Sequence, residues 1–174
     1  PSPNMPTPDT CWVYPGQVLL EGTNLSEGRG TNRPFEIFGA PFLETSPIKR
    51  SLPPEATAGC LLQEIQFRPT FHKWEGEICR GFMIHILDHR LYQPYFSTTV
   101  LLKTVLELHK EQFAWSKPPY EYEHEKMPVD VILGDSSLKI RIEKGADLFQ
   151  IKEEWVEELK KYLNRLEEAL QRDH

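Results

Sequence analysis

The sequence has no excess of positive charge, few cysteines and no long apolar run. Twenty Lys and Arg stand against 26 Asp and Glu, which gives a formal net charge of -6. This balance argues against a nucleic-acid partner, because phosphate binding needs a basic face. No apolar run approaches the roughly 18–20 residues that a membrane-spanning helix requires. We therefore expect neither nucleic-acid binding nor a membrane span in this chain.

Metal-binding patterns are also missing. The three cysteines Cys11, Cys60 and Cys79 have no C-x-x-C spacing, so a zinc site is not expected. They fit small buried or half-buried thiols. The stretch "YEYEHE" (120–125) looks like a metal cluster, but alternating side chains in a loop more often form a solvated acidic face. We expect no metal and no cofactor.

What is present fits one globular domain. The chain has 174 residues, of which 39% are hydrophobic and 26% charged, an ordinary balance for a folded domain. The stretch "RPFEIFGAPF" (33–42) predicts a short buried strand. In "EIQFRPTF" (64–71) apolar and polar residues alternate as in a half-buried strand, and Pro69 places this strand at an edge.

The stretch "EICRGFMIHILD" (77–88) predicts the central strand. Phe82, Ile84 and Ile86 point to one face, and Met83, His85 and Leu87 to the other. A strand that is apolar on both faces is normally covered on both sides. We therefore expect His85 to be a hydrogen-bonded core histidine and not a catalytic one.

Two helices are predicted from apolar spacing. Ser97 is a candidate cap for a helix that runs to Phe113. A longer one is preceded by Asp147, which resembles the start of a capping box with Gln150, and its apolar stripe is predicted to be core. The stripe consists of Leu148, Ile151, Trp155, Leu159, Leu163, Leu166 and Leu170. The fold class follows as α+β (irregular α/β): a small mixed β-sheet with a central hairpin, flanked by helices, with a long C-terminal amphipathic helix.

The segment "EGTNLSEGRGT" (21–31) is the strongest candidate for a binding site. Only one of its residues, Leu25, is apolar, so we expect it to bury little. It fails the P-loop pattern, because Gly22 and Gly28 are six apart and Arg29 follows where Lys is required. Its short polar side chains suit a hydroxyl-rich ligand such as a sugar. These are Thr23, Asn24, Ser26 and Thr31.

The charged residues of this segment allow two interpretations. Arg29, between two glycines, can bind a carboxylate with its planar fork, and Glu21 and Glu27 resemble the acid pair of glycosidases. The alternative is a tightly turned loop in which Glu27–Arg29 or Glu36–Arg33 pair locally. The residues alone leave both interpretations open.

Several stretches together resemble the YbbC-type family, which includes the exo-β-N-acetylmuramidases of peptidoglycan recycling. They are "PSPNMPTPDT", "VYPGQVLLEGTNLSEGRGTNRPFEIFGAP", "FRPTFHKWEGEICRGFMIHILD" and "PYEYEHEKMPVDVILG". The resemblance covers residues 2–155, and the block 21–31 is long for a chance match. It implies a two-domain protein in which residues 1–9 are a linker from an N-terminal Rossmann-like domain. Residues 10–174 would be the C-terminal domain.

The resemblance also implies a function. Such proteins remove N-acetylmuramic acid from the non-reducing ends of peptidoglycan fragments, in a cleft between the two domains. The catalytic glutamate would belong to the N-terminal domain, with Glu21 and Glu27 as weaker candidates, and the isolated chain would be inactive. Arg29 would bind the lactyl carboxylate of the muramic acid. Asn24, Ser26, Glu27 and Thr31 are the further substrate-binding candidates.

A second hypothesis is a non-catalytic module that binds muropeptides or a protein. On the enzyme hypothesis the partners are peptidoglycan fragments and the protein's own N-terminal domain. We expect a bacterial protein that is periplasmic or secreted.

Overall fold

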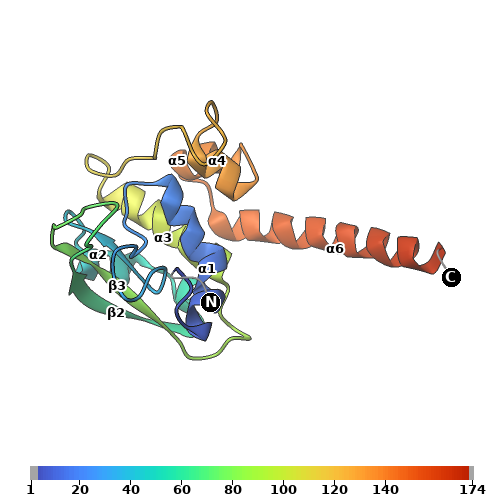
Figure 1. The fold of residues 1–174 in the computed structure, drawn as a ribbon. Coiled ribbons are helices and arrows are strands. Elements are labelled where there is room, and N and C mark those ends of the chain that lie inside the picture. The colour runs from blue at the N-terminus through green and yellow to red at the C-terminus, as the bar shows by residue number, and fades with distance from the viewer. Residues whose placement is uncertain (1–3, 173–174) are drawn as a thin grey trace.

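The computed structural model describes residues 4–172, and it shows a three-stranded sheet covered by helices on one face (Figure 1). The strands are β1 (Ile37–Ala40), β2 (Cys60–Phe67) and β3 (Cys79–Ile86). Their order is β1-β3-β2, and both pairings are antiparallel. The α+β class and the central β2–β3 hairpin are confirmed. The sheet is antiparallel throughout and not mixed, because β1 and β2 lie on either side of β3 and each pairs with it in the antiparallel direction.

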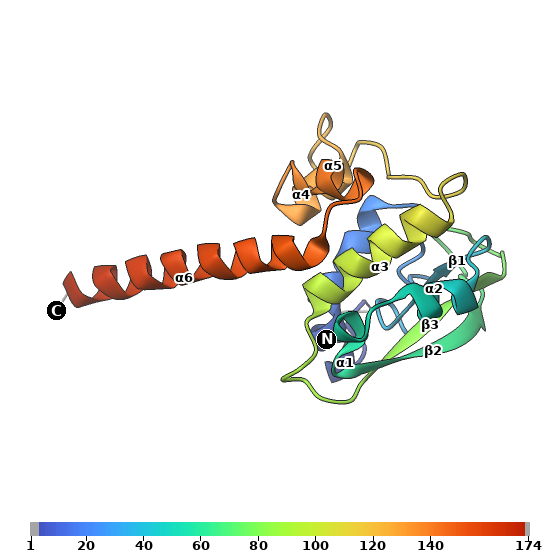
Figure 2. The ribbon, with the colours of Figure 1, turned by 180° about the vertical axis from the view of Figure 1, so that it is seen from behind.

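Helices pack on one face of this sheet and extend beyond it (Figures 1 and 2). Their bounds are α1 (Pro8–Gln17), α2 (Thr45–Ser51), α3 (Pro94–Leu108), α4 (Pro128–Leu133), α5 (Leu138–Glu143) and α6 (Leu148–Arg172), with the 3-10 turns η1 (Val18–Gly22) and η2 (Pro54–Thr57). The helix α3 begins three residues before Ser97 and ends before Phe113. None of these helices in residues 4–172 is long and apolar enough to cross a membrane.

The core lies between the sheet and the helices α1 and α3, which pack against each other (Figure 2). Phe38 and Phe82, from β1 and β3, are fully buried in it together with Leu102 of α3. Thr7 caps the start of α1, because its side chain accepts a hydrogen bond from the Thr10 amide. Pro8 then occupies the first turn, where a missing N–H costs nothing.

The opposite face of the sheet is open, which corrects one expectation. Met83 and His85 are only half-buried, and Leu87 is 71% exposed. The His85 ring nitrogen Nε2 lies 2.6 Å from Oε1 of Gln63 on the neighbouring strand. His85 is therefore a surface residue of the outer face and not a core histidine, because no helix of the described residues 4–172 covers that side (Figures 1 and 2).

The helix α6 corrects a second expectation. Leu148 and Ile151 are buried against the body, and Trp155 is partly buried. Beyond these residues the helix projects away from the rest of the molecule (Figures 1 and 2). The remaining apolar residues of its stripe, from Leu159 to Leu170, are exposed and not core.

Candidate functional site

The segment 21–31 runs through the interior of the fold, contrary to the expectation that it buries little. Leu25, Ser26 and Glu27 are each 0–1% exposed. Backbone hydrogen bonds anchor the segment on both sides. The Ser26 amide donates to the Gly39 carbonyl (2.8 Å), and the Asn24 amide donates to the Ala114 carbonyl (2.9 Å). Single antiparallel bridges, Ser26 with Gly39 and Thr23 with Trp115, thus tie the segment to β1 and to residues 112–116.

Glu27 is held inside this segment by basic side chains. It is 0% exposed, and its Oε2 accepts a hydrogen bond of 2.9 Å from Lys73 Nζ. Its Oε1 lies 3.3 Å from Arg29 Nε and from His72 Nδ1. Lys73 also donates to the carbonyls of Leu20 (2.9 Å) and Leu25 (3.1 Å). A buried carboxylate needs such compensation, and here it fixes residues 20–27 to the turn at 72–73.

Arg29 sits between Glu21, Glu27 and an aromatic ring. Its Nη2 donates to Glu21 Oε1 at 2.6 Å, and its guanidinium carbon lies 5.1 Å from the centre of the Phe35 ring. Burial alone would lower the pKa of Arg29. The hydrogen bond to Glu21 and the charges of Glu21 and Glu27 outweigh burial, so its pKa is raised. The side chain is 26% exposed, which leaves part of the guanidinium open to a ligand.

Glu21 has a second partner from a distant part of the chain. Tyr120 Oη donates to Glu21 Oε2 at 2.6 Å. Burial first, and then the hydrogen bond to Glu21 and its negative charge, raise the pKa of Tyr120. Glu21 therefore accepts one charged and one neutral hydrogen bond, and its side chain stays 13% exposed.

These groups line an open depression of about 480 Å³. Three stretches of chain form it, and its lining consists of Glu21, Arg29, Phe71, His72, Lys73, Ser116, Lys117, Pro119, Tyr120, Glu121 and Pro128. The volume lies within the range of small-molecule sites, roughly 300–1,000 Å³. Hydroxyl, cationic and carboxylate groups occur together, so the depression suits a polar ligand that carries negative charge.

The other predicted residues lie beside the depression and do not line it. Asn24 donates from Nδ2 to the Gln112 carbonyl (2.8 Å), and its Oδ1 accepts from the Ala114 amide (3.1 Å). Ser26 Oγ accepts from the Gly28 amide (3.2 Å), and Thr31 Oγ1 donates to the Gly28 carbonyl (2.6 Å). Their polar groups hold the segment in shape, and a role in substrate binding stays a prediction.

Sequence reasoning did not single out Tyr120 and Lys117 for this site. Tyr120 is the first residue of the stretch 120–125, which the sequence analysis interprets as a solvated acidic face, and Lys117 lies just before it. No local pattern marks them, because Tyr120 bonds to Glu21 across 99 positions of the sequence and Lys117 only shares the lining of the depression with Glu21 and Arg29. In residues 4–172 no group of three or more His, Cys, Asp or Glu is arranged to hold a metal ion.

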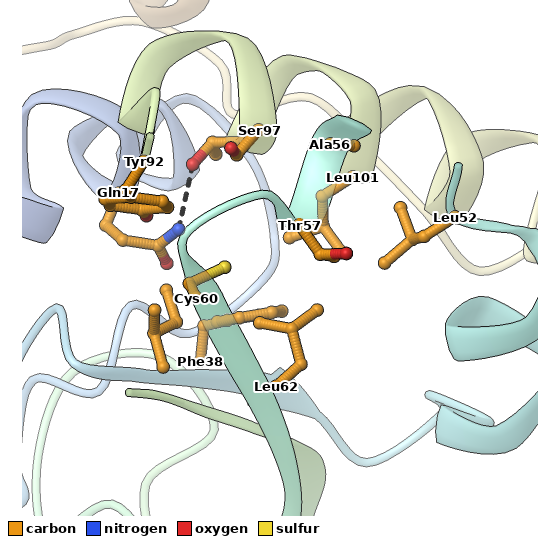
Figure 3. Close-up of a pocket in the computed structure, with 12 residues that line it drawn as sticks. Gln17, Phe38, Leu52, Ala56, Thr57, Cys60, Leu62, Tyr92, Ser97 and Leu101 are labelled. Carbon is orange, nitrogen blue, oxygen red and sulfur yellow. Dashed lines mark hydrogen bonds between the residues drawn. The ribbon is translucent and has the colours of Figure 1, made fainter. Parts of the chain in front are cut away.

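A second cavity lies between α3 and the sheet, and it is too small for a sugar (Figure 3). Its volume is about 20 Å³. Gln17 Nε2 donates to Thr98 Oγ1 (2.9 Å) at its rim, and Cys60 and Leu62 line its sheet side. Burial raises the pKa of the Cys60 thiol to about 11, so this thiol is not an activated nucleophile.

The fold and the depression define an α+β domain with an open depression that polar and charged groups line. The chain belongs to the family described as the C-terminal domain of the exo-β-N-acetylmuramidase NamZ, whose model matches residues 12–171. This confirms the resemblance found in the sequence. The chain is 33% identical over 151 residues to the peptidoglycan β-N-acetylmuramidase NamZ of Bacillus subtilis (strain 168). The match covers 87% of this chain and 34% of that protein, so the chain spans about a third of its relative.

Two solved structures share the fold. Both are DUF1343 family proteins from Bacteroides fragilis NCTC 9343. The first superposes with a TM-score of 0.76 at 18% identity and covers 94% of this chain and 42% of that one. The second has a TM-score of 0.61 at 20% identity and covers 93% and 40%, respectively. At this identity the likeness establishes the fold alone.

Proposed function

We propose that this chain is the substrate-binding half of an exo-β-N-acetylmuramidase. The enzyme would release N-acetylmuramic acid from the non-reducing ends of peptidoglycan fragments, with its catalytic glutamate in a preceding Rossmann-like domain. Membership of the family and the name of the Bacillus relative support this proposal. That relative is about three times as long as the matched region, which leaves room for a catalytic domain. A peptidoglycan substrate also favours a periplasmic or secreted enzyme.

The observation that carries the proposal is the position of Arg29 in the depression. N-acetylmuramic acid differs from N-acetylglucosamine by a lactyl ether that ends in a carboxylate. Arg29 is partly exposed and is held in place by Phe35 and Glu21. Its guanidinium presents a planar fork that matches a carboxylate. Lys117 and His72 line the same depression. A ligand carboxylate would bind Arg29 alongside Glu21 or in its place.

The two acids of the segment have different roles in this proposal. Glu27 is fully buried among Lys73, Arg29 and His72, so it cannot reach a glycosidic oxygen and acts by fixing the segment. Glu21 lines the depression, but it already accepts hydrogen bonds from Arg29 and Tyr120. Glu21 is therefore suited to orient Arg29, and a proton donor for the leaving group must come from elsewhere.

The test is Arg29→Lys in the full-length protein. Lysine keeps the charge and loses the paired geometry. We expect kcat/KM for N-acetylmuramides to fall by a factor that corresponds to about 1.5–3 kcal/mol of transition-state binding, the range for a hydrogen bond to a charged group. For analogues that lack the lactyl acid, kcat/KM should fall much less. The matched control is Arg33→Lys, because Arg33 pairs with Glu36 (2.8 Å) and does not line the depression. An equal loss for both substrates, or one that follows a lower melting temperature, would limit Arg29 to a structural role.

A non-catalytic muropeptide-binding module is the second candidate. It is favoured by one observation: neither candidate acid of this chain is placed to donate a proton, because Glu27 is buried and Glu21 is engaged twice. Full-length protein that binds muropeptides and never releases N-acetylmuramic acid would support the module and exclude the enzyme.

A further inference from the structure

The projecting half of α6 carries an exposed apolar stripe. It consists of Val156, Leu159, Leu163, Leu166 and Leu170, which are each 42–56% exposed. Their spacing is 3, 4, 3 and 4 residues, which are the first and fourth positions of a heptad. Glu and Lys fill much of the opposite face. An apolar strip of this kind on a charged helix marks a contact surface.

The stripe continues into a groove at the root of the helix. The groove lies between the start of α3 and the first exposed turns of α6. Its apolar lining consists of Pro94, Tyr95, Phe96, Trp155, Val156 and Leu159. Val156 and Leu159 thus belong to both features. The groove and the stripe form one apolar surface that runs from the body to the last turns of the helix.

We propose that this surface binds a second copy of the chain, with the two α6 helices packed antiparallel as a short coiled coil. In an antiparallel pair, first and fourth heptad positions face each other. The register that places Leu163 against Leu166 of the second copy also places Leu159 against Leu170. The two-fold symmetry repeats both pairs, so the interface has four layers of paired leucines. This inference does not depend on the proposed function.

Charge complementarity selects this register. It brings Lys160 beside Glu167 of the second copy, and symmetry repeats the pair. A shift by one heptad in either direction would instead bring together two Lys160 or two Glu167 side chains. In a parallel pair, the flanking positions opposite Lys160 and Glu167 are Trp155 and Tyr162, which offer no opposite charge. Only the first arrangement gives two attractive pairs and no repulsive one.

The groove supports the antiparallel direction as well. Because Leu170 of the second copy lies against Leu159, the tip of its helix ends beside the groove that Leu159 and Val156 line. By symmetry, the groove of each copy would be covered by the helix end of the other. In a parallel pair both tips lie far from the grooves, and these apolar surfaces would stay open to water.

The first test measures the mass of the 174-residue chain by sedimentation equilibrium over a range of concentrations. We expect a rise from 20.3 kDa towards twice that mass. Leu163→Glu should weaken the association at least tenfold, because it places two carboxylates in the central layers. The matched control is Asn164→Glu, which adds the same charge on the polar face and should leave the association unchanged. A single-chain mass at every concentration, or an association that Leu163→Glu leaves intact, would overturn the proposal.

The second test addresses the register. Lys160→Glu and Glu167→Lys should each weaken the dimer, and the double swap should restore it. Lys160 also pairs with Glu157 within the same helix (2.8 Å), so circular dichroism must show equal helix content in all variants. A dimer that the single changes do not weaken, or that the double swap does not restore, would rule out this antiparallel register.

Discussion

At the scale of single residues, the fold is held by buried carboxylates with several partners. Glu36, the residue before β1, is 1% exposed. It accepts hydrogen bonds from the hydroxyls of Thr7 and Thr10, and Arg33 Nη1 lies 2.8 Å from its Oε2. Burial alone would raise the pKa of Glu36. The three hydrogen bonds and the charge of Arg33 outweigh burial, so its pKa is lowered.

This network predicts an acid-dependent loss of stability. A carboxyl whose pKa is lower in the folded state stabilises the fold above the pKa of the unfolded chain, and this contribution is lost as the pH falls through the folded-state value. Glu36→Gln should lower the free energy of unfolding at pH 7 by about 1.5–3 kcal/mol, and the difference should shrink as the pH falls below the ordinary carboxyl range. Urea unfolding against pH measures both.

The control for Glu36 is Glu64→Gln. Glu64 also accepts a hydrogen bond from a hydroxyl, that of Thr45 (2.6 Å), but at an exposed site. Glu64→Gln should therefore change the free energy of unfolding little at any pH. A Glu36→Gln deficit that stays constant down to acid pH would show that lost packing, and not charge, is responsible.

At the scale of elements, the segment 21–31 is shaped by close contacts between backbones. Gly30 has a φ of +81°, and a Cβ atom built on it would lie 2.6 Å from the Phe71 carbonyl oxygen. The Thr70 amide donates to the Gly30 carbonyl at 2.9 Å. The segment therefore meets residues 70–71, next to His72 and Lys73 of the depression, at a distance that only glycine permits.

Gly30→Ala should destabilise the protein more than Gly76→Ala does. Gly76 has nearly the same φ, +76°, but a Cβ atom there meets nothing within 4 Å. Gly76→Ala should cost about 1–2 kcal/mol for the left-handed backbone. Gly30→Ala should add about 1–3 kcal/mol of overpacking. Urea unfolding of the two variants gives the difference, and equal losses would mean that residues 70–71 move aside freely.

At the scale of the whole molecule, the proposed function makes this chain one wall of a site. The depression is open, and the two candidate acids are buried or engaged by other groups. The Bacillus relative is much longer than the matched region. A second domain that closes over the depression would supply both the missing wall and the catalytic acid.

The isolated 174-residue chain should therefore show no turnover of a chromogenic N-acetylmuramide, while the full-length protein hydrolyses it. Near-ultraviolet circular dichroism of the isolated chain should confirm that it is folded. Turnover by the chain alone would contradict this prediction. Loss of that turnover in Glu21→Gln would then identify Glu21 as a catalytic residue.

The sequence by itself determined the features that depend on local pattern. The alternation of apolar residues located β3, and the proline-flanked run 33–42 located the buried strand β1. Three- and four-residue spacing located α6. The block 21–31 identified the family. These features are encoded in neighbouring residues, because the period of a strand or helix decides which side chains share a face.

Only the tertiary structure decided what covers each face. The pattern of β3 is apolar on both sides, yet helices pack on one side alone and leave His85 at the surface. The stripe of α6 is continuous, yet the body ends near Trp155. The segment 21–31 has one apolar residue, yet Lys73 and the backbones of Gly39 and Ala114 bury it. A local period shows which face is apolar, but the partners that bury it or neutralise its charges come from distant parts of the chain.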